Sequence, residues 1–448
     1  MLFEDTIVAI ATPPGIGGIA VVRLSGPKSI DIVSKCLSSV SLKPHRATYA
    51  DFKNPQTGIL IDETVVTYFQ APKSYTAEDV IEVSCHGGHY LAEQILRSLL
   101  DLGARMAEPG EFTRRAFLNG RIDLSQAEAV ADLIASQTNS SHQMALHQLK
   151  GELKAAVDRI RGELIDTISL LELELDFSED EITTTPYDKI SDAILRLKGS
   201  CGQLVETYRN GKIYRHGILA PIVGKPNAGK SSLLNILLRE ERALVSDIPG
   251  TTRDTIEESI SHNGVEIRLV DTAGLRSSED QIESMGISRA EKVMNMADIL
   301  LQVIDITDTE PPDPLPGKND IPVIQIYNKI DLVPETTARQ KNGGIYTSAL
   351  SGQGVTEIAD VILAKILGGS PKKESGESVT ITNERHRNAL NKAIHSLDTA
   401  MESVEKQMSS EFIVVDLRSA LNALGFITGQ TTTDDILNNI FAKFCIGK

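Results

Sequence analysis

Hydrophobic positions follow mixed strand-like and helical patterns near the N-terminus, and a helical pattern beyond about residue 123. Two apolar runs, 6–11 and 18–24, flank a Gly/Pro turn, residues 80–84 alternate as a strand does, and 89–102 have helical spacing. Farther along, apolar residues recur every third or fourth position at Leu146, Leu149, Leu153, Val157, Ile160, Leu164, Ile168, Leu171 and Leu175. The pattern predicts an α+β region followed by the core stripe of a helical bundle.

Local signals place helix starts within this second region. Ser125 with Glu128 fits a capping box, and Thr185-Pro186 predicts another helix, because proline is favoured in the first turn. The apolar face of that second helix comprises Ile190, Ile194, Leu197, Leu204 and Tyr208. Residues 370–378, SPKKESGES, form a polar linker, after which helical spacing resumes at 383–408. We therefore expect three domains: 1–118, a discontinuous helical domain at 119–213 and 371–448, and an inserted domain at 214–370.

Composition supports a multidomain chain that works without a membrane. With 448 residues, of which 41% are hydrophobic, the chain is long enough for two to four domains with sizeable cores. It has no apolar run of 18 or more residues and no basic segment at its acidic N-terminus, which excludes a membrane span and a signal peptide. The cysteines are scattered without paired spacing, at Cys36, Cys85, Cys201 and Cys445. We expect a reduced, cytoplasmic protein.

The formal net charge of −16 limits how this chain can bind nucleic acid. Affinity for a phosphate backbone depends largely on Lys and Arg side chains that replace counterions. An acidic chain therefore needs a local basic patch or a basic partner if its substrate is a nucleic acid.

The segment GKPNAGKS at 224–231 carries the clearest chemistry in the chain. It follows an apolar run and precedes an amphipathic stretch, the strand–loop–helix context that a phosphate-binding loop requires. Gly224 and Gly229 let backbone amides point at phosphate oxygens, and the helix start adds its positive dipole end. Lys230 is then expected to reach the β- and γ-phosphates, and the Ser231 hydroxyl to bind Mg²⁺. A glycine turn with a chance Lys-Ser pair is the alternative, and the flanking pattern disfavours it.

Two segments that follow fit the switches of a nucleotide-dependent protein. DIPGTTRD at 247–254 supplies Thr252, which can close over Mg²⁺ and the γ-phosphate. VEIRLVDTAG at 265–274 is an apolar strand that ends in Asp271, suited to a water-mediated hold on Mg²⁺, and the Gly274 amide can sense the γ-phosphate.

Two more segments fit recognition of guanine. In VIQIYNKID, Asp331 can accept both N–H donors of the guanine edge and Asn328 can meet the purine. In YTSAL, the Ala349 amide can donate to guanine O6. Together the motifs predict a Ras-like P-loop GTPase domain, a mostly parallel sheet with helices on both faces. The GTP-binding residues we expect are Asn227, Ala228, Gly229, Lys230, Ser231, Ser232, Ser246, Asp247, Ile248, Pro249, Gly250, Thr251, Thr252, Asp271, Thr272, Ala273, Gly274, Asn328, Lys329, Asp331, Ser348, Ala349 and Leu350.

The segment after DTAG lacks the glutamine that orients water in many switch GTPases, because Leu275 stands there. Glu283, in the acidic stretch SSEDQIES, is the best-placed substitute, and a solvated switch loop is the alternative. Asn227, with backbone carbonyls from 246–251, could also hold a monovalent cation beside the phosphates, since oxygen ligands suit a hard ion.

Three motifs outside the GTPase segment have weaker interpretations. PPGIGG at 13–18 fits a tight turn. Cys85, His86 and His89 resemble zinc ligands, but no second ligand pair lies near, so a glycine turn before a helix is favoured. The C-terminal FAKFCIGK is either a mobile end or a functional tail that includes Cys445.

Taken together, the motifs PGIGGIAVVRLSG, CHGGHY, PGEFTRRAFLNGRIDLSQAEAV, GKPNAGKS, SDIPGTTRD, DTAGLR, NKID and FCIGK resemble those of the MnmE (TrmE) family of tRNA-modification GTPases. The resemblance covers the whole chain. It implies an N-terminal folate-binding domain that dimerises, a helical domain and an inserted GTPase domain. It also implies a flavoprotein partner, MnmG (GidA), with which the family modifies C5 of the wobble uridine of certain tRNAs. The group added is aminomethyl or carboxymethylaminomethyl, and the one-carbon donor is 5-formyl- or 5,10-methylene-tetrahydrofolate.

The resemblance also implies roles for individual residues. Folate contacts fall on Arg23, Glu82, Arg121 and Lys448, although many family members have Lys where this chain has Arg121. The family's C-terminal cysteine corresponds to Cys445. Potassium ligands fall on Asn227, Ser246, Ile248 and Thr251, magnesium ligands on Ser231 and Thr252, and the catalytic residues are Lys230 and the water-positioning Glu283. In the family, two GTPase domains meet across nucleotide and K⁺ when GTP is hydrolysed.

Two other functions remain open from the sequence. One is an RNA- or ribosome-binding switch, which usually carries a basic RNA-binding domain after its GTPase domain, whereas this chain resumes an acidic-to-mixed helical pattern. The other is a folate-dependent transferase that uses its GTPase domain only for regulation or assembly.

Overall fold

The computed structural model describes residues 3–38, 40–176, 186–240, 257–271, 292–312, 321–334, 344–368, 379–442, 444, 445 and 447. Two compact units make up the chain. One unit comprises Met1–Ile134, Gln148–Cys201 and Asn388–Lys448, and the other comprises Ala135–His147 and Gly202–Arg387.

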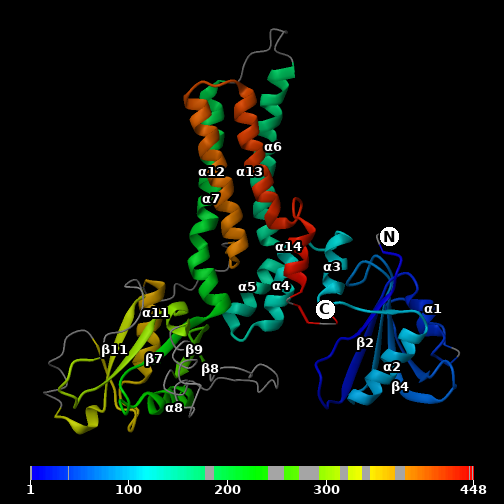
Figure 1. The fold of residues 1–448 in the computed structure, drawn as a ribbon. Coiled ribbons are helices and arrows are strands. Elements are labelled where there is room, and N and C mark those ends of the chain that lie inside the picture. Colours follow the sequence, from blue (N-terminus) through cyan, green and yellow to red (C-terminus); the bar gives the residue numbers. More distant parts are fainter. Residues whose placement is uncertain are drawn as a thin grey trace. The chain divides into compact units, whose positions relative to one another are not determined.

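The first unit begins with a six-stranded sheet in the order β3-β4-β5-β2-β1-β6 (Figure 1). Its strands are β1 (Ile7–Ile10), β2 (Ile19–Ser25), β3 (Ala47–Lys53), β4 (Leu60–Phe69), β5 (Val80–His86) and β6 (Arg105–Met106). Neighbours are antiparallel except β1 and β6, which are parallel. The predicted strands and the predicted helix, which is α2 (His89–Asp101), are confirmed to within two residues at most ends.

One face of this sheet carries the larger core cluster, and the other carries polar side chains beside a smaller buried cluster of Ile7, Ala9, Ala107 and Phe112. Alternate residues of β2 and β5, such as Val22 and Val83, are fully buried in a cluster shared with α1 (Ser29–Ser34) and α2. Because successive side chains of a strand point to opposite faces, Arg23 and Glu82 lie on the other face.

Helices make up the rest of the first unit. They are α3 (Glu111–Leu118), α4 (Leu124–Ala135), α6 (Glu152–Asp176), α13 (Ser410–Thr428) and α14 (Asp434–Phe441), with α5 (Asn139–Leu149), α7 (Tyr187–His216) and α12 (Glu384–Glu405) belonging partly to each unit. Leu153, Val157 and Leu164 of the predicted stripe are buried on α6, which packs against α13. The stripe is interrupted at Gly151, whose φ of 88° separates α5 from α6.

The capping box predicted at Ser125 and Glu128 is wrong by two residues. The Gln126 amide donates to Asp123 Oδ1 at 3.0 Å, and Gln126 Oε1 accepts from the Asp123 amide at 3.0 Å. Asp is as good an N-cap as Ser, so the earlier pair begins α4. The Ser125 hydroxyl, now inside the helix, donates to Asp123 Oδ1 at 2.6 Å.

The second unit contains a six-stranded sheet in the order β12-β11-β10-β7-β9-β8. Its elements are β7 (Ile218–Val223), α8 (Lys230–Glu240), β8 (Glu257–His262), β9 (Val265–Asp271), β10 (Leu300–Asp305), β11 (Val323–Asn328), the 3₁₀ turn η1 (Ile330–Leu332), β12 (Ile345–Tyr346) and α11 (Thr356–Leu367). All neighbours are parallel except β8 and β9. This is the doubly wound arrangement that was predicted for a Ras-like domain.

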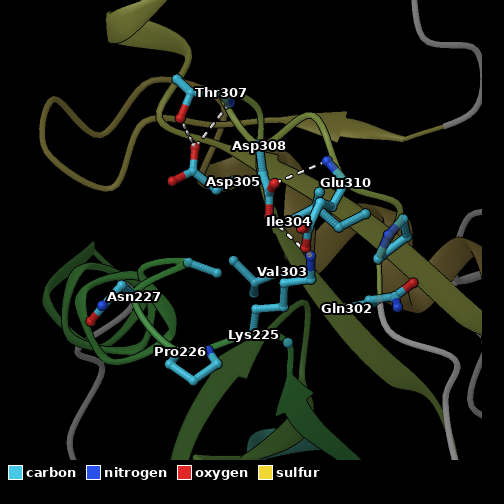
Figure 2. Close-up of a pocket in the computed structure, with 13 residues that line it drawn as sticks. Lys225, Pro226, Asn227, Gln302, Val303, Ile304, Asp305, Thr307, Asp308 and Glu310 are labelled. Atoms are coloured by element: carbon cyan, nitrogen blue, oxygen red, sulfur yellow. Dashed lines mark hydrogen bonds and ion pairs between the residues drawn. The ribbon is translucent and has the colours of Figure 1, made fainter.

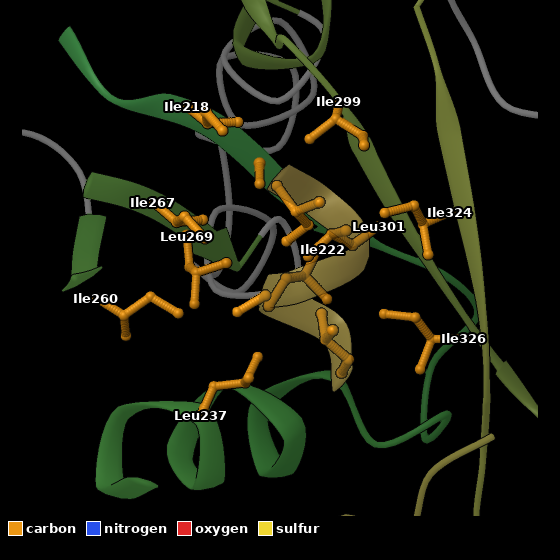
Figure 3. Packing of buried hydrophobic residues seen from close by; sticks show 14 of the residues in the cluster. Ile218, Ile222, Leu237, Ile260, Ile267, Leu269, Ile299, Leu301, Ile324 and Ile326 are labelled. Atoms are coloured by element: carbon orange, nitrogen blue, oxygen red, sulfur yellow. The ribbon is translucent and has the colours of Figure 1, made fainter. Parts of the chain in front are cut away.

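Both faces of this second sheet are buried. Ile222 and Leu301 belong to a cluster that includes Leu237 of α8 and residues of α11 (Figure 3). Val223 and Leu300, which point the other way, pack with Met294 in a second cluster. Burial on both sides explains why the β7 sequence is a continuous apolar run.

Within the described ranges, no helix is both long enough and apolar enough to cross a lipid bilayer. The same ranges contain no group of three His, Cys, Asp or Glu side chains that could hold a metal ion. Around the zinc-like motif, Cys85 is buried and burial raises the pKa of its thiol to about 11, while His86 Nδ1 lies 2.7 Å from Asp62 Oδ1. Gly88 follows them as the N-cap of α2, so the motif leads directly into a helix.

Candidate functional site

The phosphate-binding loop lies between the buried strand β7 and helix α8. Gly224 has φ of 149° and Gly229 has φ of 95°, a region that side chains rarely adopt. A Cβ at Gly224 would lie 2.2 Å from the Val303 carbonyl oxygen, and one at Gly229 would lie 2.2 Å from Asn328 Nδ2. The loop is therefore drawn against the ends of β10 and β11, and only glycine fits at both positions.

Lys230 and Ser231 begin α8 at the carboxyl edge of the sheet. Lys230 Nζ donates to the carbonyl oxygens of Gly224 at 2.9 Å and Lys225 at 2.8 Å. The ammonium is thus held over the loop by carbonyls that phosphate oxygens can replace. Ser231 Oγ donates to Asp271 Oδ2, the end of β9, at 2.6 Å. A hydroxyl and a carboxylate this close form an oxygen pair of the kind that Mg²⁺ prefers.

The residues that were predicted to recognise guanine meet where β11 ends. Asn328 is 2% exposed, and its Nδ2 donates to the Ala228 carbonyl oxygen at 2.9 Å. Its Oδ1 accepts from the Ala349 amide at 3.0 Å. Ser348 Oγ donates to Asp331 Oδ1 at 2.5 Å, which orients that carboxylate. A single buried amide therefore joins the phosphate loop to the segment that was predicted to meet guanine O6.

Lys329 and Leu350 are the other residues that were predicted to lie near the guanine. Lys329 has φ of 68°, and its Nζ donates to Asp305 Oδ2 at 2.6 Å. Burial acts to raise the pKa of Asp305, but hydrogen bonds from Lys329 and Thr307 outweigh it and hold the pKa below its usual value. Asp305 is therefore ionised at neutral pH and fixes the lysine. Leu350 is 86% exposed, as expected of a side chain available to a planar ligand.

A cavity of about 260 Å³ lies beside the phosphate loop, between residues 224–228 and the segment that follows β10 (Figure 2). Across it, Lys225 Nζ contacts Asp308 Oδ2 at 3.1 Å and Glu310 Oε2 at 3.0 Å. Asn227, the predicted potassium ligand, stands on the loop with φ of 64°, a conformation that Asn tolerates. The loop is thus held by side chains on both sides.

Several predicted residues lie outside the described residues. They are Ser246, Asp247, Ile248, Pro249, Gly250, Thr251, Thr252, Thr272, Ala273 and Gly274 of the nucleotide set, together with Glu283 and Lys448. The structure brings together the remaining nucleotide residues, with Ser232 next to Ser231 at the start of α8.

A second polar site lies on the face of the N-terminal sheet that carries Arg23 and Glu82. Arg23 of β2 and Glu82 of β5 are register partners, and Arg23 Nε and Nη2 contact Glu82 Oε1 at 2.9 Å and 2.8 Å. Arg23 Nη1 also donates to the carbonyl oxygen of Gly447 at 3.2 Å. The structure therefore brings the C-terminal tail, 424 residues away in sequence, to the predicted folate residues.

Tertiary contacts add residues to this second site that the sequence did not reveal. The Arg23 guanidinium lies over the rings of Tyr75 at 5.7 Å and Phe112 at 5.8 Å. Arg121 Nε donates to the Tyr75 carbonyl oxygen at 3.0 Å. Tyr75 lies in a segment with no motif that would have indicated a site. Its position beside Arg23 could be found only from the fold.

The C-terminal tail is fitted closely to this unit. Gly447 is buried with φ of 93°, and a Cβ there would lie 2.6 Å from the Ile10 carbonyl oxygen. The Gly110 amide donates to the Cys445 carbonyl oxygen at 3.4 Å, and the Cys445 side chain is exposed. Cys445 and Gly447 are therefore held by contacts within this unit, and a functional role for Cys445 stays a prediction.

Comparisons with known proteins match this chain along its whole length. A family model described as the MnmE helical domain matches residues 124–445, and one described as the GTP-binding protein TrmE N-terminus matches residues 6–121. The tRNA modification GTPase MnmE of Alkaliphilus oremlandii (strain OhILAs) is 41% identical over 463 residues, covering 100% of both chains. The tRNA modification GTPase MnmE of Syntrophus aciditrophicus (strain SB) is 43% identical over 465 residues, again covering 100% of both.

Among solved structures, the FeoB G-domain from Methanococcus jannaschii aligns with 34% of this chain and 98% of its own, at 23% identity and a TM-score of 0.25. That similarity is too low to add to the assignment, which depends on the full-length relatives and the two family models. The chain belongs to the MnmE (TrmE) family of tRNA-modification GTPases.

Proposed function

We propose that this chain is a K⁺-dependent GTPase that, with the flavoprotein MnmG, modifies C5 of the wobble uridine of certain tRNAs. The product carries an aminomethyl or carboxymethylaminomethyl group, and a one-carbon tetrahydrofolate derivative, 5-formyl or 5,10-methylene, supplies the carbon. One observation carries the proposal. A single chain contains both a guanine-nucleotide site built around Lys230 and Asn328 and a second site where Arg23, Glu82 and the C-terminal tail meet.

The residues of the nucleotide site support GTP hydrolysis because they would position the phosphates, the base and the attacking water. Lys230 would exchange its two carbonyl partners for β- and γ-phosphate oxygens. Ser231 and Thr252 would supply oxygens for Mg²⁺, with Asp271 holding the ion through water, and the ion would offset phosphate charge. Asp331, oriented by Ser348, accepts the guanine N–H donors. We assign the positioning of water to Glu283, and a K⁺ site to Asn227 with Ser246, Ile248 and Thr251. A bound K⁺ would supply the positive charge that an arginine finger supplies in other GTPases.

The second site supports recognition of a folate. A carboxylate such as Glu82 suits the N–H edge of a pterin, and guanidinium groups such as those of Arg23 and Arg121 suit carboxylates. Lys448 would add a further cation.

We further propose three domains: 1–118, 119–213 with 371–448, and 214–370. Two copies of the chain would dimerise through the first domain, and the protein would be cytoplasmic. Closing and opening of paired GTPase domains would then pass through the helical domain to the modification centre.

Wobble-uridine modification in a reconstituted system tests the function as a whole. The full-length chain, purified MnmG, unmodified tRNA, GTP, 5,10-methylene-tetrahydrofolate and either ammonium or glycine as the source of nitrogen are expected to yield modified uridine, measured by mass spectrometry of nucleosides. The matched control is Lys230→Ala, which removes the contact to the β- and γ-phosphates and is expected to abolish the product. Binding of tRNA without any modification under all these conditions would favour the RNA-binding switch.

Potassium dependence is a separate prediction about hydrolysis. Steady-state GTP hydrolysis by the full chain is expected to be at least about tenfold faster in KCl than in NaCl at equal ionic strength, because the larger ion fits oxygens that Na⁺ cannot span. The measurement is phosphate release at matched salt concentrations. Asn227→Ala is expected to remove the difference between the two salts. Equal rates for the unmodified chain in KCl and NaCl would contradict the cation site.

A further inference from the structure

The ring of Tyr75 lies at the centre of the second site, although no family motif pointed to it. The Arg23 guanidinium is 5.7 Å from the ring centroid, within the range of a cation–π contact. The same guanidinium contacts Glu82 at 2.8 Å. Arg23 is therefore held by an aromatic face on one side and by a carboxylate on the other.

The backbone of Tyr75 holds a second cation. Its carbonyl oxygen accepts from Arg121 Nε at 3.0 Å, and the neighbouring Thr76 carbonyl oxygen accepts from Asn119 Nδ2 at 2.8 Å. Arg121 itself is exposed beyond this contact. The segment that follows α3 is thus hydrogen-bonded to the loop that carries Tyr75.

That loop is rigid because several contacts fix it. The Tyr75 hydroxyl lies 2.8 Å from Thr113 Oγ1, and Thr76 Oγ1 lies 2.6 Å from Ser25 Oγ on β2. Ser74 Oγ donates to the Glu78 carbonyl oxygen at 2.5 Å. Burial raises the pKa of Tyr75, although Thr113 and the two arginines act to lower it, so the hydroxyl stays neutral at physiological pH. The ring therefore presents a fixed, uncharged aromatic face.

We propose that Tyr75 is a positioning residue of the folate site, whose ring sets the orientation of Arg23 and whose carbonyl sets the place of Arg121. This inference rests on the folate-binding function proposed above. Since Arg23 and Arg121 are separated by 98 positions in sequence, the spacing of the two guanidinium groups depends on the one residue that contacts both. A ligand with carboxylates and a planar ring needs that spacing fixed before it binds.

Folate binding to full-length variants tests this role. With 5-formyl-tetrahydrofolate as the probe and isothermal titration calorimetry as the measurement, Tyr75→Leu is expected to weaken binding at least about tenfold, because the aromatic face under Arg23 is lost. Tyr75→Phe keeps the ring and is expected to bind within about twofold of the unmodified chain. Thr113→Val removes the partner of the hydroxyl alone and is the matched control, with no expected change.

A double-mutant cycle separates positioning from general loosening of the loop. Combining Tyr75→Leu with Arg23→Met is expected to weaken binding no more than Arg23→Met alone, because Tyr75 acts through Arg23. The melting temperature of the Tyr75→Leu chain is expected to stay close to that of the unmodified chain. Unchanged affinity in Tyr75→Leu, or additive losses in the double variant, would overturn the proposal.

Binding by the unmodified chain and by Glu82→Gln separates failure of the Tyr75 role from failure of the folate-binding function on which it rests. If the unmodified chain fails to bind the probe, the folate-binding proposal itself fails. If the unmodified chain binds, Glu82→Gln weakens binding and Tyr75→Leu does not, then only the role of Tyr75 is wrong.

Discussion

Replacing Asp331 by Asn is expected to change the preferred nucleotide from GTP to xanthosine triphosphate. A carboxylate accepts both the N1–H and the exocyclic amine of guanine, whereas xanthine has a carbonyl in place of that amine and needs a donor opposite it. Losing such a matched pair in a built site costs roughly 10³-fold or more in kcat/KM. Asp331 is suited to this test because a hydrogen bond from Ser348 Oγ orients its carboxylate.

The measurement is kcat/KM for both nucleotides with the unmodified and the Asp331→Asn chains. GTP is expected to lose roughly 10³-fold, and xanthosine triphosphate to gain most of that factor. Ser348→Ala is the matched control, because it removes the hydrogen bond that orients Asp331 but leaves the carboxylate. Ser348→Ala is expected to lower kcat/KM modestly for both nucleotides, and the chain is expected to keep its preference for GTP. A variant that still prefers GTP would show that Asp331 does not meet the base.

Arg115→Met is expected to destabilise the first unit by about 3–5 kcal/mol, the cost of removing one partner from a buried ionic network. Arg115 has no exposed surface, and its Nη2 donates to Asp5 Oδ1 at 2.8 Å and to Glu111 Oε1 at 3.0 Å. Its Nη1 contacts Glu78 at 3.4 Å. Methionine fills similar space but removes the Arg115 contacts of the buried Glu78 and Glu111 carboxylates, of which Glu111 keeps its ion pair with Arg105.

Urea unfolding followed by circular dichroism measures this loss, as a shift of the transition that belongs to the first unit. The neighbouring Arg114 supplies the matched control, since Arg114→Met removes an arginine from the same helix turn without breaking an ion pair among the described residues. It is expected to cost much less. Equal losses for the two variants would mean that the network around Arg115 contributes no more than packing.

The network around Arg115 makes the destabilisation caused by Arg115→Met depend on pH. Burial acts to raise the pKa of Glu111 and of Asp5, but hydrogen bonds from Arg105 and Arg115 outweigh it and hold both pKa values below their usual values. A carboxyl group with a lowered pKa stabilises the fold above its unfolded pKa, and that stabilisation is lost as the pH falls through the folded value. The difference between Arg115→Met and the unmodified chain is therefore expected to be largest near neutral pH and to shrink below about pH 4.5.

The sequence predicted the elements that depend on local pattern. The apolar run of β7 followed by GKPNAGKS required a strand, a turn and a helix in that order, and the structure has them at Ile218–Val223, 224–229 and Lys230–Glu240. The helical stripe of α6 was likewise visible, because a buried face repeats every three or four residues. Its interruption at Gly151 was not, since apolar spacing continues across the break.

Some contacts between distant segments could be predicted from the family resemblance, and the others could not be predicted from the sequence. Arg23 and Glu82 were expected at one site, but their pairing comes from the register of β2 against β5. Tyr75 was not expected there, because an aromatic residue in a polar loop has no signature of its own. The Arg115 network was also missed, since burial of a charged side chain is decided by partners from other segments.

By itself, the sequence determined the identity of the nucleotide, the order of the elements and the parts that are helix or strand, because these follow from residue type and spacing along the chain. The tertiary structure alone decided that Asn328 joins the phosphate loop to Ala349, that Tyr75 lies under Arg23, and that the C-terminal Gly447 reaches β2. The physical reason is that such contacts depend on sheet register and on close backbone approach. Those are set by packing of the whole unit, to which each local segment contributes only a part.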